Sequence, residues 1–119
     1  MTDDCKIDAL VAEYVMRLPV GYMSEEDVIP FIIVDQATAS FAGIPKYSTD
    51  LVDAWKVVEK LKADGFLVSV ETSTETGRVD ILKRRFDGLA HWEPVISVET
   101  VDVPQAICLA SLKLRGVEI

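Results

Sequence analysis

The change of hydrophobic period at Gly65 is the feature that most constrains the fold of this chain. Before it, apolar residues recur at helical spacing and follow Ser48, a residue type that caps helix starts. After it, Phe66–Glu71 alternates apolar and polar residues, as a half-buried strand does. A helix that gives way to a strand at a glycine predicts mixed α and β structure. The helical positions are Leu51, Trp55, Val58 and Leu61, and we interpret Trp55 as a core residue.

Two further helices are predicted near the ends of the chain. Apolar residues at three- and four-residue steps indicate a helix over Asp3–Leu18, which Thr2 can cap and Pro19 ends. A second apolar pattern indicates a helix over Pro104–Arg115, followed by Gly116.

Four further segments have strand character. The apolar run Val28–Val34 is β-branched, and its proline predicts that the strand starts late or lies on an edge. Gln36–Ser40 is interpreted as a short second strand. Val79–Phe86 and Glu93–Val101 continue from Phe66–Glu71 as an antiparallel meander, and Pro94 places the start of the last strand near an edge.

The resulting order predicts an α+β fold over a single domain, residues 1–119. We expect a three-layer helix–sheet–helix sandwich around a mostly antiparallel sheet of four or five strands.

Composition and charge exclude several classes of function. The chain has 119 residues, with 12 basic and 20 acidic side chains and a formal net charge of −8. This charge disfavours general nucleic-acid binding and anionic membrane surfaces. No window approaches the roughly 18 apolar residues that a membrane span needs. A disulfide between Cys5 and Cys108 is possible, but nothing in their spacing demands one. Without a visible signal peptide, the simpler interpretation is an intracellular protein with free thiols, and we expect Cys108 to be buried in its helix.

Three segments, taken in order, resemble the phage ABA sandwich domain, a family of small phage and prophage proteins. They are Leu10–Glu13, Pro45–Leu61 and Thr100–Leu112. The resemblance implies helix–sheet–helix layers, phage origin and a location in the bacterial cytoplasm. It transfers no functional residue. Leu109 stands where similar proteins usually carry a basic residue, and Met23–Phe41 has no counterpart.

The cluster Ser48, Thr49 and Asp50 allows two interpretations. As a functional site, it would direct a helix N-terminus at a small anion. As a structural feature, it is a helix cap with a supporting hydroxyl, which we prefer because such caps are common.

A second candidate binding region comprises Lys83, Arg84, Arg85, His91 and Trp92. The basic run would hold a phosphate-bearing ligand, or else form a solvated strand face. His91 would act as a general base, although a loop or strand-start residue is the simpler interpretation. Trp92 and Phe41, if exposed, would favour a binding surface or a subunit contact. We assign no catalytic residue, no metal and no cofactor, because the single histidine and the lack of a CxxC pair match no zinc motif.

These observations leave three hypotheses. The first is a non-enzymatic phage accessory protein that binds a host protein or a small molecule, with counter-defence as one purpose. The second is an enzyme acting on a small phosphorylated molecule through Arg84, Arg85 and His91. The third is a minor virion component. A homodimer is expected, because small domains with loop aromatics often pair.

Overall fold

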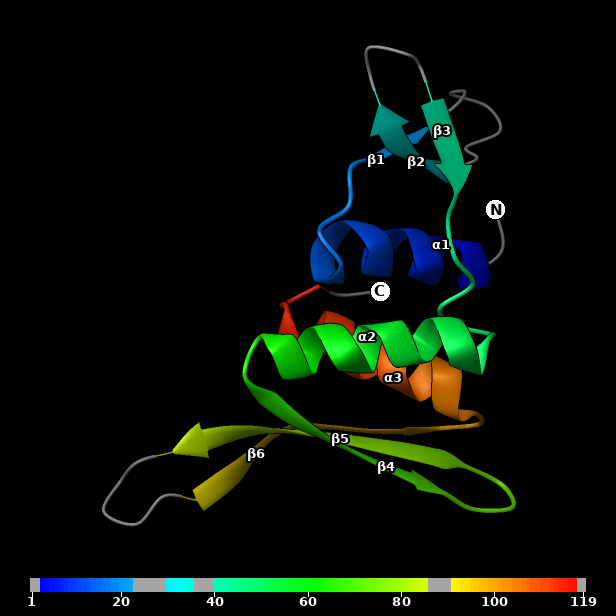
Figure 1. The fold of residues 1–119 in the computed structure, drawn as a ribbon. Helices are drawn as coiled ribbons and strands as arrows, with labels where there is room; N and C mark the ends of the chain where they lie inside the picture. The colour runs from blue at the N-terminus through cyan, green and yellow to red at the C-terminus, as the bar shows by residue number, and fades with distance from the viewer. Residues whose placement is uncertain (1–2, 23–29, 36–39, 86–90, 118–119) are drawn as a thin grey trace.

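A computed structural model describes residues 3–22, 30–35, 40–85 and 91–117 of the chain (Figure 1). The described elements in chain order are α1 (Asp3–Leu10), η1 (Val11–Val15), β1 (Val20–Tyr22), β2 (Pro30–Asp35), β3 (Ser40–Gly43), α2 (Leu51–Ala63), β4 (Phe66–Thr72), β5 (Gly77–Arg85), β6 (His91–Thr100) and α3 (Val103–Leu114). The fold is therefore α+β, as the sequence predicts.

The strands form two separate three-stranded antiparallel sheets, in the orders β1-β2-β3 and β4-β5-β6. The prediction of one sheet with four or five strands is therefore not confirmed. The early strands pair with one another, and Val20 lies opposite Ile32. Hydrophobic period specifies which face of a strand is buried but not which strand lies beside it, so the division into two sheets could not be read from the sequence.

Helices α2 and α3 cover one face of the β4-β5-β6 sheet, and α1 lies on their far side, between them and the β1-β2-β3 sheet (Figure 1). The predicted helix–sheet–helix layering is not confirmed in this arrangement. The residues of β5 explain why one face is covered: Val79 and Ile81 are buried beneath the helices. The opposite face carries the exposed ion pair between Arg78 and Asp80, with 3.2 Å between nitrogen and oxygen. A helix packed there would have to desolvate both charges.

The core lies between the three helices and the central strand β5. Among its fully buried members are Val11, Val57, Ile81, Ile107 and Leu112. Cys108 is also buried, which confirms the predicted packing role, and it forms no disulfide with Cys5.

The first helix matches the predicted span but ends three residues earlier. Its last turn, η1, is widened, because the Met16 N–H donates to the Val11 carbonyl five residues back at 2.9 Å. Arg17 then adopts a left-handed conformation with φ of 55°, and Pro19 prevents continuation.

The strand predictions are largely confirmed. β2 begins at Pro30, which agrees with the late start, and β6 is an edge strand that contains Pro94. The strand β1 was not predicted. β3 overlaps the predicted Gln36–Ser40 only at Ser40, and residues 36–39 lie outside the described residues.

Helix ends follow the predicted pattern with one correction. Gly65 and Gly116 adopt the left-handed φ values of 96° and 76° that end α2 and α3. The prediction that Ser48 caps α2 is wrong: Asp50 is the N-cap, and its side chain accepts hydrogen bonds from two backbone N–H groups. The interpretation of Trp55 as a core residue is also wrong, because 47% of its surface is exposed.

Candidate functional site

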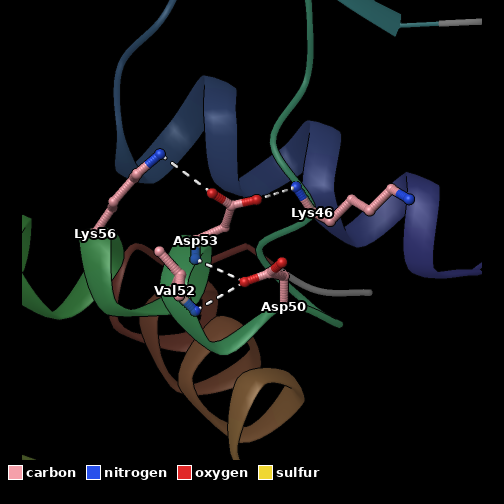
Figure 2. Close-up of polar contacts among 5 residues, drawn as sticks. All are labelled: Lys46, Asp50, Val52, Asp53 and Lys56. Atoms are coloured by element: carbon pink, nitrogen blue, oxygen red, sulfur yellow. Dashed lines mark hydrogen bonds and ion pairs between the residues drawn. The ribbon is translucent and has the colours of Figure 1, made fainter.

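The N-terminal end of α2 is closed by carboxylates (Figure 2). Asp50 Oδ1 accepts hydrogen bonds from the N–H groups of Val52 at 2.8 Å and Asp53 at 3.3 Å. The Asp53 carboxylate accepts from the backbone N–H of Lys46 at 3.0 Å and from Lys56 Nζ at 3.1 Å. The helix therefore supplies its own negative charge at the position where an external anion would bind.

Ser48 is buried beside this helix start instead of capping it. Its backbone N–H donates to Asp8 Oδ1 at 2.7 Å, and its hydroxyl donates to the Asp4 carbonyl at 3.4 Å. Thr49, the next residue, is exposed. The two predicted site residues therefore face different environments, and Ser48 connects the loop before α2 to α1.

The Asp8 carboxyl is buried between α1 and this loop. Burial raises its pKa, and the hydrogen bonds from Ser48 offset only part of that shift. The charges of Asp4 and Asp53 raise the pKa of Asp8 further.

Tyr47 and Cys108 lie in the same buried region. Burial raises the pKa of Tyr47 to about 12, and Asp53, Asp8 and Cys108 add to the shift. Burial also raises the pKa of the Cys108 thiol. A thiol that resists ionisation is a poor nucleophile, so this cluster has a structural role.

One side of α2, from Trp55 to Lys62, borders an open groove of about 430 Å³. Its walls come from α2, from the first residues of β4 and from one tryptophan of β6. The lining residues are Trp55, Val58, Lys62, Gly65, Phe66, Leu67, Val68 and Trp92. The β4 residues that line it are the first three of the strand, and Trp92 of β6 lies just beyond them across the sheet, so the groove lies at the end of the sheet where β4 begins.

The groove combines two aromatic rings with a basic rim. Trp55 is 47% exposed and Trp92 is 40% exposed. Lys62 lines the groove, with its Nζ 3.7 Å from Glu59, while Arg84 lies over the ring of Trp92 at 5.8 Å. None of the residues that line the groove is acidic, although the chain has a net charge of −8.

The structure brings together some residues of the predicted basic region and separates others. Arg84 lies opposite Trp92 in the β5–β6 pairing, and Arg85 lies opposite His91. Lys83 and Arg84 are both exposed but point to opposite faces of the sheet, because strand side chains alternate. The basic run therefore does not form one surface. His91 is exposed at the start of β6.

Trp92 was predicted from the sequence to favour a binding surface if exposed, whereas Trp55, which lines the same groove, was interpreted as a core residue. A signal was present in the sequence. The buried face of α2 comprises Ala54, Val57, Val58 and Leu61, which already form a complete helical stripe. Trp55 is an additional large apolar residue beside that stripe, and such a residue lies exposed at its edge.

The described segments contain no group of three or more His, Cys, Asp or Glu side chains arranged to hold a metal ion. Within the same segments, every helix is too short or too polar to cross a membrane.

The fold and the groove together define a small α+β protein with a surface site bordered by aromatic residues. The phage ABA sandwich domain family matches residues 9–112, and the chain belongs to that family. No curated protein and no solved structure matches the chain.

Proposed function

We propose that this phage protein is a non-enzymatic binding protein, and that the groove between α2 and β4 is its binding site. The supporting observation is the pair of half-exposed tryptophans, Trp55 and Trp92, on one groove. Large aromatic residues that remain in water are costly for a soluble domain, and they are typical of surfaces that bind a partner.

The lining favours a ligand that combines a flat or apolar group with negative charge. The indole rings offer stacking surfaces, and Lys62 supplies a positive charge at the rim. A small host signalling molecule fits this description, as does an apolar side chain from an acidic segment of a host protein. The proposal includes action in the bacterial cytoplasm, with counter-defence as one purpose.

A thermal-shift screen with nucleotides and cyclic nucleotides tests the small-molecule form of this proposal. We expect a compound that raises the melting temperature of the wild type to lose its effect on Trp55→Ala and on Trp92→Ala. Leu51→Ala is the matched control, because Leu51 is an exposed apolar residue of α2 that does not line the groove. A shift that survives both tryptophan substitutions would place the binding site elsewhere.

If every compound leaves the melting temperature unchanged, the host-protein form of the proposal remains to be tested. In that case, host proteins retained by the immobilised wild type should be lost from immobilised Trp55→Ala and retained by Leu51→Ala. Equal retention by the wild type and Trp55→Ala would contradict the proposed site.

One observation favours an enzyme as a second candidate function. The β5–β6 pairing places Arg84 and Arg85 opposite Trp92 and His91 at one end of the sheet. An enzyme that acts on a small phosphorylated molecule would lose turnover in His91→Ala and Arg84→Ala with its fold intact, whereas a binding protein has no turnover to lose.

A further inference from the structure

Strand β4 is an edge of the β4-β5-β6 sheet, so alternate backbone N–H and C=O groups have no partner strand on that side. Its apolar residues Val68 and Val70 are only half-buried, whereas Val79 and Ile81 of the central strand are fully buried. Unpaired backbone groups specify the chemistry of an occupant: it must be another extended strand.

The two edges of this sheet differ in their protection against pairing. The other edge, β6, contains Pro94, which cannot donate to a ladder, and a bulge at Val95 where the register shifts between Ile81 and Leu82. β4, with the sequence FLVSVET, contains no proline and no lysine, and its pairing with β5 is regular over all seven residues. Proline and bulges are devices that protect edges, and β4 lacks both.

We propose that β4 pairs antiparallel with β4 of a second copy of this chain, around a two-fold axis at Ser69. The two sheets then join into one continuous sheet. This proposal goes beyond the proposed function, and it differs from the dimer expected from loop aromatics, because the contact is a strand edge.

The sequence of β4 is complementary to itself in this register. The two-fold axis places Val68 of each copy opposite Val70 of the other, so two apolar pairs extend the half-buried face. Leu67 of each copy lies opposite Glu71 of the other, so the two Glu71 carboxylates do not oppose each other.

Leu67, Ser69 and Glu71 are exposed and point to the face of the sheet away from the core, whereas Val68 and Val70 pack against the core. In this register the Glu71 carboxylates therefore stay in water while the apolar pairs extend the face that α2 and α3 cover. The strand that fits beside β4 in this register is thus β4 itself.

Sedimentation velocity on two matched variants tests the dimer. Ser69 and Ser97 are both exposed, and each lies opposite Asp80, one on β4 and the other on β6. Lysine at either position faces the same carboxylate, so both variants should fold. Ser69→Lys also places two positive charges against each other at the two-fold axis.

We expect the wild type and Ser97→Lys to sediment as dimers at about 100 µM, and Ser69→Lys to sediment as a monomer. A monomeric wild type at that concentration overturns the proposal, as does a Ser69→Lys protein that remains dimeric. Dissociation of both variants also overturns it, because the contact would not be specific to β4.

Hydrogen exchange on the wild type provides a second test that does not depend on a variant. The amides of β4 that point away from β5 should gain protection as protein concentration rises, while those on the free side of β6 should not. Protection that is independent of concentration contradicts the dimer. A Ser69→Lys protein that loses the dimer but still binds ligand would show that the proposed function does not depend on the dimer. A Trp55→Ala protein that loses ligand binding but still dimerises would show that the dimer does not depend on the groove.

Discussion

The N-terminal end of α2 and the side of α2 that borders the groove differ in how they meet their surroundings. At its N-terminal end, Asp50 and Asp53 accept four hydrogen bonds (Figure 2), and Tyr47 is buried with 2% of its surface exposed. Along one side of the helix, Trp55 and Lys62 line an open groove together with Trp92 of β6. The N-terminal end is polar and closed, and the groove side is aromatic and open.

This difference shows that a sequence with the residue types of a known binding motif does not by itself form a binding site. Ser48, Thr49 and Asp50 have the composition of an anion-binding helix start, yet the hydrogen bonds around them are made within the chain. Trp55 belongs to no motif, yet its ring remains available to a partner. What distinguishes the two regions is whether their groups already have partners within the chain, more than which residue types they contain.

The largest test of this comparison replaces one aromatic residue in the closed region and one in the groove. Tyr47→Ala should lower the free energy of unfolding by about 3–5 kcal/mol, because it empties a buried site. Trp55→Ala should lower it by about 1 kcal/mol or less, since much of the ring is already in water. Urea unfolding monitored by circular dichroism measures both values. Equal losses would show that the groove around Trp55 is as closed as the region around Tyr47.

A smaller effect is expected from the cap of α2. Asp50→Ala should lower the free energy of unfolding by about 1 kcal/mol, because the N–H groups of Val52 and Asp53 lose their acceptor. Thr49→Ala is the control at the neighbouring exposed position and should change stability by less than about 0.5 kcal/mol. If Thr49→Ala has the larger effect in thermal or urea unfolding, the cap has been assigned to the wrong residue.

The smallest effect concerns pH. Burial raises the pKa of Asp8 above its ordinary value of 3.8, so the folded protein binds this proton more tightly than the unfolded chain. The contribution of Asp8 to stability is therefore present at low pH and is lost as the pH rises through its folded pKa. Asp8→Asn removes this titration, and its amide oxygen can still accept the hydrogen bond from Ser48.

We therefore expect the stability of Asp8→Asn, relative to the wild type, to increase between about pH 4 and about pH 7. Urea midpoints at several pH values measure this difference. A difference that does not change with pH would mean that Asp8 is more hydrated than its position between α1 and the loop before α2 implies.

The sequence was a good guide wherever local chemistry decides the structure. Gly65 and Gly116 end their helices, Pro30 delays β2, and the meander from Phe66 onward was predicted to within a few residues. These features depend on backbone geometry and on side-chain period, which a short stretch of chain carries within itself.

The candidate site was only partly predictable for the same reason. Trp92 could be assigned to a binding surface, because an aromatic residue near a turn is often exposed. The prediction failed for Trp55, because its helical spacing from Val58 and Leu61 was interpreted as burial, although Ala54, Val57, Val58 and Leu61 already fill the buried face.

By itself, the sequence determined the α+β class, the three helices, the β4–β6 meander and the family. Tertiary structure alone decided that the strands divide into two sheets, that Ser48 is buried against Asp8, and that Trp55 and Trp92 share a groove. The physical reason is the separation in sequence between the residues that interact. Caps, turns and periodicity act between residues a few positions apart, whereas strand pairing and grooves arise from contacts between segments that are distant in the chain.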